Sequence, residues 1–344
     1  MTKQVKIRNI IIGGGAEIAV QSMTNVPVDN AEATLSQIKR LTDAGCDIVR
    51  IAVPNAKSVA AFRKIRDRVD APLVADIHFD ARLAVEVIEA GADKVRINPG
   101  NTPLSQLDAV IDCAKTNGTV IRLGVNAGSV DNTFLSACNG DVAAAMAKNL
   151  QSYVEYFEKR GFYDLVLSVK SSDVRVTVKA NRLISVMPYP VHLGVTEAGL
   201  AYQGIIKNSI GIGSLLLDGI GDTIRVSLTS DPVEEVAAGH AILSALGLRQ
   251  GVQFVSCPKC GRCSVDLETV AEEIYEYVRP IRKNLKIAVM GCEVNGPGEC
   301  RDADLGLAGG GGRFAFFKNG KIYKRVEQER AVEEFKKEID LLCK

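Results

Sequence analysis

The sequence predicts an α/β protein with a (β/α)8 TIM barrel over residues 1–247 and a smaller α+β domain over residues 248–344. The first observation is a unit that recurs from Ile18 to about Leu228. Each copy has a short Val/Ile/Leu-rich run, a polar turn, and an amphipathic stretch of helix length that ends in Ala-Gly or Gly. The second is a change of composition after Gly247–Gly251, which we interpret as a short link between domains.

The recurring unit is visible as an internal sequence repeat, called the internal echo below. Residues Asp43–Ile51 read DAGCDIVRI, residues Glu89–Ile97 read EAGADKVRI, and Arg160–Leu167 repeats the pattern more faintly. Each copy places the end of a helix, a glycine and the start of a strand in that order.

Eight apolar runs are expected as strands. They are Ile18–Gln21, Asp47–Ile51, Leu73–Asp76, Lys94–Ile97, Thr119–Leu123, Leu165–Val169, Val191–Leu193 and Thr223–Leu228. Eight parallel strands that alternate with helices favour a closed barrel. An open, doubly wound sheet is the alternative, because the periodicity of one sequence does not show closure.

The second domain is expected to begin after a helix from about Val233 to Ala245. Its predicted elements are strand Gln253–Val255, helix Leu267–Val278, strand Lys286–Met290, a hairpin of Phe314–Phe317 and Lys321–Val326, and helix Glu327–Leu342. This order predicts a small α+β domain.

Composition excludes several classes of protein. The 344 residues carry a formal net charge of +1, which gives no field that would attract nucleic acid or an anionic membrane. Nine cysteines, two of them in Cys-x-x-Cys, indicate metal-ligating thiolates in a reducing compartment, so we expect the cytoplasm. We expect neither a signal peptide nor a membrane-spanning run.

Cysteines gather in two segments of the second domain. Cys257-Pro-Lys-Cys260 places two thiolates on one turn, and the segment Gly291–Cys300 returns Cys292 on what we expect to be a loop kept free of helix by Gly and Pro. Such soft ligands suit zinc or an iron-sulfur cluster equally well.

Polar side chains gather where the barrel strands end. Residues two apart on a strand share a face, so the strand ends predict what lines the mouth of a barrel. They are Arg50, Asp76, His78, Arg96, Asn98, Arg122, Asn126, Ser168, Lys170, Thr196, Glu197, Arg225 and Ser227. So many cations are costly unless an anion neutralises them, and arginine suits phosphate oxygens, so we expect a ligand with more than one phosphoryl group. The alternative is that each cation pairs with Asp47, Asp76 or Glu197.

Other chemically capable residues have simpler interpretations. His192 lies in an apolar run and is a candidate core histidine, and His240 is expected on the surface or in packing. The isolated cysteines are expected to be inert or packing residues; they are Cys46, Cys113, Cys138 and Cys343. The run Gly309–Gly312 is not a phosphate loop, because no Lys-Ser/Thr follows it.

Several motifs together resemble one family across essentially the whole chain. They are Gln21-Ser-Met-Thr24, His192-Leu-Gly-Val-Thr-Glu197, Cys257-Pro-x-Cys-Gly-Arg262 and Gly291-Cys-x-Val-Asn-Gly-Pro-Gly-Glu299. This set closely resembles the bacterial 4-hydroxy-3-methylbut-2-en-1-yl diphosphate synthases.

The resemblance implies an iron-sulfur oxidoreductase of the methylerythritol phosphate route to isoprenoids. It implies reductive ring opening and dehydration of 2-C-methyl-D-erythritol 2,4-cyclodiphosphate to (E)-4-hydroxy-3-methylbut-2-enyl diphosphate, with two electrons delivered through a [4Fe-4S] cluster. Flavodoxin or ferredoxin would be the electron donor, and a head-to-tail homodimer would form each site between chains.

The resemblance also implies roles for residues. Residues 1–247 would bind substrate through Arg50, His78, Arg96, Asn98, Arg122, Asn126, Lys170, Arg225 and Ser227. Residues 248–344 would hold the cluster through Cys257, Cys260, Cys292 and Glu299, with Asn295 meeting the substrate from the cluster side. Asp76 and Glu197 are candidates for proton handling, or else they orient the cations. Cys263 and Cys300 stand where the family usually has other residues.

Two rival interpretations stay open. A zinc-stapled binding module would use Cys257, Cys260, Cys292 and Cys300 as an all-thiolate site. A redox-silent aldolase-type barrel would use Lys170 for a Schiff base.

Overall fold

The structure is a computed structural model that describes residues 1–77, 80–98, 103–292 and 296–344. It divides into two compact units, Met1–Ile242 and Leu243–Lys344. The division falls in the last turns of α9 (Pro232–Ala245), whereas the sequence placed the boundary just after this helix. Among the described residues no helix combines the length and the hydrophobicity needed to cross a membrane.

The first unit is built on eight parallel strands in the order β8-β7-β6-β5-β4-β3-β10-β9. The strands are β3 (Ala19–Met23), β4 (Ile48–Ala52), β5 (Leu73–Asp76), β6 (Lys94–Ile97), β7 (Val120–Asn126), β8 (Leu165–Lys170), β9 (His192–Leu193) and β10 (Thr223–Ile224). A parallel bridge from Leu167 to Val191, next to β9, closes the ring, and Leu167 N donates to Pro190 O at 2.8 Å. The predicted TIM barrel is confirmed, and the open sheet is excluded.

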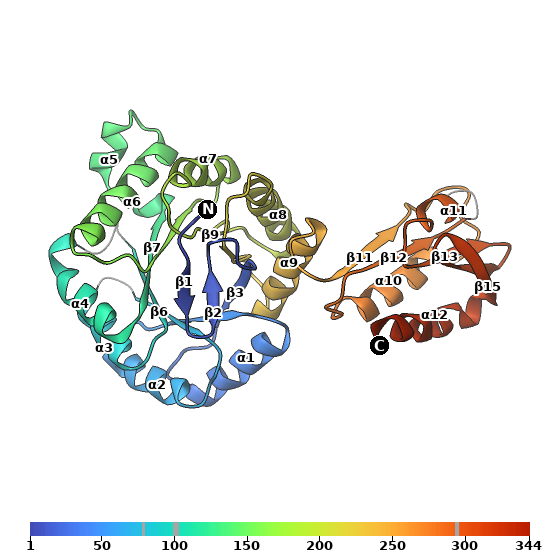
Figure 1. Ribbon diagram of the computed structural model, residues 1–344, viewed down its shortest axis with the longest axis horizontal. Helices are drawn as coiled ribbons and strands as arrows, with labels where there is room; N and C mark the ends of the chain where they lie inside the picture. The colour runs from blue at the N-terminus through green and yellow to red at the C-terminus, as the bar shows by residue number, and fades with distance from the viewer. Residues whose placement is uncertain (78–79, 99–102, 293–295) are drawn as a thin grey trace. The chain divides into compact units, whose positions relative to one another are not determined.

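Helices form an outer ring around these strands (Figure 1). They are α1 (Ala31–Asp43), α2 (Ala56–Arg66), α3 (Ala81–Glu89), α4 (Asp108–Asn117), α5 (Asn132–Ala137), α6 (Val142–Lys159), α7 (Val174–Ile184), α8 (Ala201–Leu217) and α9, with 3-10 turns η1 (Leu104–Gln106) and η2 (Ala127–Ser129). Asparagine or aspartate caps the first turn of several of them; Asn30 accepts from Ala33 N in α1.

The internal echo corresponds to one type of helix ending. After α1, Gly45 has a φ of 94°, Cys46 N donates to Leu41 O and Gly45 N donates to Thr42 O. This is a Schellman motif, which needs the left-handed backbone that glycine adopts without strain. The same pair of bonds follows α3 at Gly91 and α6 at Gly161.

An N-terminal hairpin covers the amino end of the barrel. Strands β1 (Val5–Ile7) and β2 (Ile10–Ile12) pair antiparallel, and in Figure 1 they lie across the ring. The sequence analysis had not expected these strands. The hairpin contributes Val5, Ile7 and Ile12 to an apolar cluster with the barrel residues Ala19, Ile48, Val74, Val120 and Val166. The lower end of the barrel is thus filled by hydrophobic side chains.

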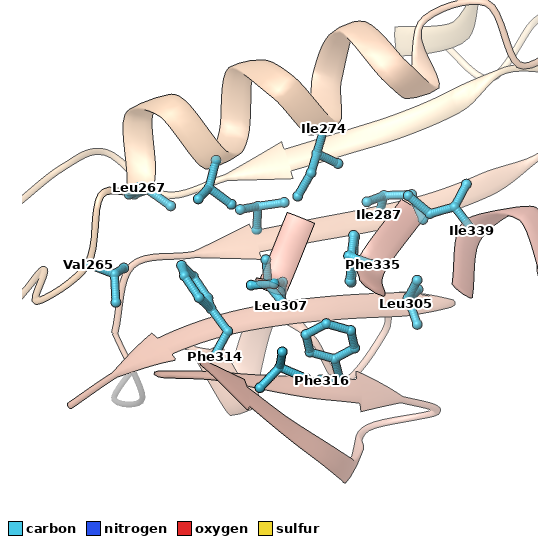
Figure 2. Close-up of a cluster of buried hydrophobic side chains, with 14 of the residues drawn as sticks. Val265, Leu267, Ile274, Ile287, Leu305, Leu307, Phe314, Phe316, Phe335 and Ile339 are labelled. Carbon is cyan, nitrogen blue, oxygen red and sulfur yellow. The ribbon is translucent and has the colours of Figure 1, made fainter. Parts of the chain in front are cut away.

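The second unit is a five-stranded sheet in the order β11-β12-β13-β14-β15, parallel through β13 and antiparallel after it. The elements are β11 (Val252–Ser256), α10 (Leu267–Val278), β12 (Leu285–Met290), α11 (Gly296–Glu299), β13 (Leu305–Gly310), β14 (Arg313–Lys318), β15 (Lys321–Glu327) and α12 (Gln328–Cys343). Helices α10 and α12 pack on one apolar core with residues of β12, β13 and β14, as Figure 2 shows.

The structure adds one strand to this unit and contradicts one prediction. Strand β13 was not expected, because its glycines have low strand propensity. They are needed for packing: a Cβ on Gly306 would lie 2.5 Å from Cys300 Sγ, and one on Gly309 would lie 2.4 Å from Val265 Cγ2. The expectation of a helix-free loop fails, since α11 forms one helical turn with Pro297 near its start, where proline is tolerated.

Candidate active site

Strand register places the predicted strand-end residues on the inner face of the barrel. Asp76 lies opposite Arg96, and Arg96 lies opposite Arg122 on the next strand. Residues opposite one another in register share a face. Lys94 lies on that same face and reaches Gln21 Oε1 at 3.3 Å, across the barrel from β6 to β3, so the shared face is the interior.

The interior holds more cations than carboxylates. Counted over the described residues, the cations of the upper barrel are Arg50, Lys94, Arg96, Arg122, Lys170 and Arg225, and the buried carboxylates beside them are Asp76 and Glu235. Arg122 is 2% exposed and Lys170 is 6% exposed. Such an excess of buried positive charge is unfavourable for folding without a ligand.

Asp76 offsets part of this charge. Its carboxylate lies 2.6 Å from Arg50 Nη2 and 3.5 Å from Arg96 Nη1, and its side chain is 2% exposed. Of the two roles considered for Asp76, these ion pairs favour the orienting one. Asp47, which the alternative interpretation also named as a partner for the cations, accepts from the backbone N–H of Val20 at 2.7 Å through Oδ2.

Glu235 orients a second arginine and was missed by the sequence analysis. It lies in the first turn of α9 and accepts from Arg225 Nη2 at 3.1 Å and from Arg225 Nε at 3.2 Å. It also accepts from Ser22 Oγ at 2.8 Å and from Leu228 N at 3.0 Å. An acidic residue in a first helical turn is usually explained by the helix dipole, so the sequence gave no reason to expect a buried partner for Arg225.

Arg122, Lys170 and Lys94 have no carboxylate partner within the described part of the chain. Arg122 Nη1 instead lies 3.2 Å from Ser168 Oγ. Burial, with Arg50 and Arg96 nearby, holds the pKa of Arg122 well below its usual range. Burial and the neighbouring Arg122 lower the pKa values of Lys170 and Lys94 strongly. Burial also lowers the pKa of Arg96 to about 10, partly opposed by Asp76.

Two glycines on the inner face make room for these long side chains. A Cβ on Gly194 would lie 2.7 Å from Lys170 Nζ and 2.5 Å from Arg225 O. A Cβ on Gly124 would lie 2.8 Å from Ser168 Oγ and 3.2 Å from Arg96 Nε. The interior is therefore packed around its cations, and a larger residue at either position would displace them.

The other predicted mouth residues lie at the same end of the barrel, except that His78 is outside the described residues. Asn98 Oδ1 accepts from Ser129 Oγ at 3.2 Å, and Ser129 Oγ in turn accepts from Asn126 N at 3.3 Å. Ser227 is half-buried after β10. His78 lies outside the described residues of the barrel, as Asn295 does in the second unit.

Glu197 occupies a special backbone position. It is exposed on the turn after β9 and has a φ of 53°, which few non-glycine residues adopt. Strained backbone of this kind concentrates at functional sites. The described contacts of Glu197 include no ion pair with the arginines.

The two histidines placed outside the site differ from each other. His192 is fully buried in the barrel interior, where its Nδ1 lies 2.7 Å from Thr223 Oγ1. Burial and the nearby Lys170 lower its pKa well below the usual range, and its Nε2 has no hydrogen-bond partner among the described atoms. His240 is a buried packing residue, with Nε2 3.0 Å from Gly45 O.

The cysteine segments of the second unit meet at one backbone group. Gly291 N donates to Cys257 Sγ at 3.3 Å, which brings the first segment against the residue before Cys292. Cys292 is buried, Cys257 is half-buried and Cys260 is exposed, with its pKa lowered by the backbone N–H of Arg262. Among the described residues, no three Cys, His, Asp or Glu side chains lie close enough together to hold a metal ion. Three thiols on two segments joined by an N–H···S bond fit a cluster in their chemistry.

Cys263 and Cys300, the other two cysteines of these segments, have contacts of their own. Cys300 is 0% exposed and packs in an apolar cluster with residues such as Met290 and Phe317. Cys263 Sγ donates to Val265 O at 3.3 Å. Neither contact favours the all-thiolate zinc site. The side chain of Glu299 is not among those described, although its backbone lies in α11.

A cavity of about 440 Å³ lies at the other end of the barrel. Its lining includes Lys6, Arg8, Asp93 and Thr119, which belong to the hairpin and to residues that precede or begin strands. Ligands of TIM barrels bind at the carboxyl ends of the strands, so this cavity is not the candidate site.

Fold and site together define a class of protein. It is a TIM barrel whose interior carries buried cations suited to a phosphorylated anion, joined to a cysteine-bearing α+β domain. The family model for the GcpE TIM-barrel domain matches residues 2–240, and the model for the GcpE protein C-terminal domain matches residues 253–341. The chain therefore belongs to the GcpE family.

Relatives of known name agree over the full length. The chain is 50% identical to 4-hydroxy-3-methylbut-2-en-1-yl diphosphate synthase (flavodoxin) from Caldanaerobacter subterraneus subsp. tengcongensis, covering 100% of this chain and 98% of that protein. Enzymes of the same name are 49% identical in Thermotoga petrophila, covering 98% and 96%, and 48% identical in Clostridium acetobutylicum, covering 98% of each chain. The predicted family and its enzyme class, an oxidoreductase of isoprenoid biosynthesis, are confirmed.

Solved structures support the barrel alone. Dihydropteroate synthase from Xanthomonas albilineans aligns with a TM-score of 0.53 at 18% identity, covering 71% of this chain and 98% of that one. At this identity the likeness shows the fold and not the reaction.

Proposed function

We propose that the enzyme converts 2-C-methyl-D-erythritol 2,4-cyclodiphosphate to (E)-4-hydroxy-3-methylbut-2-enyl diphosphate. Two electrons enter, the cyclic diphosphate opens, and one hydroxyl leaves as water. The observation that carries the proposal is the group of buried cations, Arg122, Lys170 and Lys94, that lack carboxylate partners within the described residues. A diphosphate supplies the negative charge that this interior lacks.

The barrel, residues 1–247 in the sequence division, is the proposed substrate-binding domain. The diphosphate would be held by Arg50, His78, Arg96, Asn98, Arg122, Asn126, Lys170, Arg225 and Ser227. Asp76 and Glu235 hold Arg50, Arg96 and Arg225 in fixed positions, so these guanidinium groups lose little freedom when they bind phosphate.

Residues 248–344 form the proposed cluster domain. Cys257, Cys260, Cys292 and Glu299 would hold a [4Fe-4S] cluster, and Asn295 would face the substrate. When bound, the cluster would provide one-electron transfer, through which the two electrons of the reduction would pass from the electron donor one at a time. The Gly291 N–H that donates to Cys257 Sγ would stabilise negative charge on that sulfur.

Proton handling is assigned to Glu197 and Asp76. The leaving hydroxyl needs a proton donor. Glu197 is exposed at the carboxyl end of the barrel, whereas Asp76 is held between two arginines, so Glu197 is the better candidate.

The proposed setting follows from the same chemistry. A flavodoxin, as in the names of the relatives, or a ferredoxin would deliver the electrons. Thiolate ligands and these donors suit the reducing cytoplasm, with neither nucleic acid nor membrane as a partner.

The deciding experiment is anaerobic turnover of the cyclodiphosphate with a chemical reductant. Iron and sulfide are assayed first: about four of each per chain are expected for a [4Fe-4S] cluster, whereas zinc without sulfide would support the zinc-stapled module. Formation of the linear diphosphate supports the proposal. Borohydride trapping of a carbonyl substrate on Lys170, without reduction of the cyclodiphosphate, would instead support the aldolase-type barrel.

We also propose a head-to-tail homodimer in which each cluster domain serves the partner's barrel. Only residues 246–251 separate α9 from β11, which is a short connection for a domain that must reach the carboxyl end of its own barrel. Two strongly impaired variants test this: Arg122→Met, with its cluster domain intact, is mixed with Cys292→Ala, with its barrel intact, and activity is compared with that of each variant alone. Activity should return when subunits exchange, and its absence despite proven exchange would show that each chain completes its own site.

A further inference from the structure

Lys94 is a buried lysine that the strand-end analysis did not include. It begins β6, two residues before Arg96 on the same face, and is 0% exposed. Among the described residues, its one hydrogen bond is from Nζ to Gln21 Oε1, at 3.3 Å. An ammonium group has three N–H donors, so a single long bond to an amide leaves a charged Lys94 poorly solvated.

The groups around Lys94 are cationic on most sides. Facing the interior are Arg50 on β4, Asp76 on β5, Arg122 on β7, Lys170 on β8, His192 on β9 and Arg225 after β10, with Gln21 on β3. The hairpin below contributes only apolar side chains to the packed cluster. Within the described interior, Asp76 forms ion pairs with Arg50 and Arg96, and Glu235 forms one with Arg225. Neither carboxylate forms a described ion pair with Lys94.

These surroundings favour the neutral amine when the mouth holds no anion. Burial, then Arg122 and Arg50, lower the pKa of Lys94 well below its usual range. Burial and the neighbouring Arg122 lower the pKa of Lys170 in the same direction. A multiply charged anion at Arg122 and Arg50 would reverse the sign of the nearby charge and favour protonation.

We propose that Lys94 is a positioning residue beneath the phosphate site, a buried amine that takes up a proton from solvent when a diphosphate fills the mouth and returns it when the anion leaves. The inference rests on the proposed function only in assigning a phosphorylated anion to this mouth. Lys94 acts through Arg122 and Arg50, because its added charge keeps the interior matched to the anion. Binding is thereby coupled to pH, and affinity falls as pH rises.

The test is calorimetric titration of the anaerobically purified, cluster-loaded enzyme with inorganic pyrophosphate. The same titration is run in two non-phosphate buffers of different ionisation enthalpy, so that the difference in heat counts the protons taken up. Lys94→Met replaces the amine by an apolar group of similar length, and Lys115→Met is the matched control on the exposed face of α4. Pyrophosphate itself titrates, so the readout is the difference between proteins.

Wild type and Lys115→Met should take up the same number of protons, and Lys94→Met should take up fewer, by up to about one per site. The affinity of Lys94→Met should also depend less steeply on pH. Equal proton uptake in Lys94→Met and wild type would overturn the inference.

A second probe needs no variant. Sulfate keeps its charge of −2 between pH 7 and 9, so any protons taken up from solvent when sulfate binds are bound by the protein and not by the ligand. Binding of sulfate or pyrophosphate without such uptake overturns the inference and leaves the proposed function standing. If neither anion binds the wild-type enzyme, the phosphate site itself, and with it the proposed function, is wrong.

Discussion

The interiors of the two units contrast sharply. The core of the second unit is aliphatic and aromatic, with Phe314, Phe316 and Phe335 fully buried in it (Figure 2). The upper interior of the barrel instead holds six cations and two carboxylates among its described residues. Apolar burial stabilises a fold, whereas uncompensated buried charge opposes folding. The second core stabilises its unit, whereas the charge of the barrel interior supports the proposal that this interior binds an anion.

Within the barrel, apolar packing and buried charge lie at different levels along the barrel axis. Its lower layer packs Ile48, Val74 and Val120 against the hairpin, and Lys94, in register with Val74 and Val120, is the cation nearest to this layer. Its upper layers carry the charges, and outward residues such as Val49 and Ile121 are fully buried. The barrel can therefore carry an unfavourable interior because its other layers supply hydrophobic stabilisation.

The largest expected effect lies in the second core. Phe335→Ala removes a fully buried ring whose centroid lies 5.4 Å from that of Phe316, and should destabilise this unit by about 3–5 kcal/mol. Hydrogen exchange of peptides from β13 and β14 would report the loss of protection. Leu341→Ala, at an exposed position of α12, is the control and should change little. Unchanged exchange in Phe335→Ala would remove the contrast between the two interiors.

Replacing a barrel cation should lower activity, whereas replacing Phe335 should lower stability. Arg122→Met should lower kcat/KM by about ten- to a hundredfold, or roughly 1.5–3 kcal/mol, because a charge-assisted contact to phosphate is lost. Iron content should be unchanged, since Arg122 lies in the other unit. Arg182→Met, which breaks an exposed pair with Asp218, is the control and should keep full activity. Full activity in Arg122→Met would favour a purely structural cation.

Glycine positions sharpen the comparison further. Gly194→Ala would place a methyl group 2.7 Å from Lys170 Nζ and should weaken pyrophosphate binding while costing about 1–3 kcal/mol of stability. In α8, Gly213 has open space around it, so Gly213→Ala should be neutral or stabilise by up to about 1 kcal/mol. Similar effects of both substitutions on anion affinity would argue against a tightly packed cationic interior.

The smallest effect expected is on the pH dependence of stability. The pKa of Lys94 is lowered in the folded state, so between that value and about 10.4 the unfolded chain binds more protons. The unfolding free energy contributed by this group therefore rises with pH across that window. Lys94→Met should flatten this rise in urea unfolding of the ligand-free enzyme. A steeper rise in the variant would contradict the assignment.

Sequence periodicity predicted the barrel because each repeat contains its own signals. Apolar runs alternate with amphipathic helices, and Gly45 and Gly91 mark the helix ends in the sequence itself. The strand-end cations could also be predicted, because alternation along a strand determines which side chains share a face. These signals are local in the chain.

The parts that escaped prediction depend on contacts between distant segments. Lys94 stands at the start of a strand, and only the closed barrel shows that its amine is buried under the arginines. Glu235 is 10 residues from Arg225 but meets it only after α9 turns back. Strand β13 carries glycines that weaken its local signal and are explained by the bulk of Val265 and Cys300 beside them.

We propose that the barrel interior is kept charged, at a cost in stability, in order to bind a phosphorylated anion. Thermal unfolding of the anaerobic, cluster-loaded enzyme, with and without pyrophosphate, tests it in wild type and in Arg122→Met. Pyrophosphate should raise the unfolding midpoint of wild type, with a gain of about 2.7 kcal/mol in stability at a hundred times Kd. Ligand-free Arg122→Met should unfold at or above the wild-type temperature and respond far less to pyrophosphate. A ligand-free variant that unfolds several degrees lower, with an undiminished response to pyrophosphate, would contradict the account.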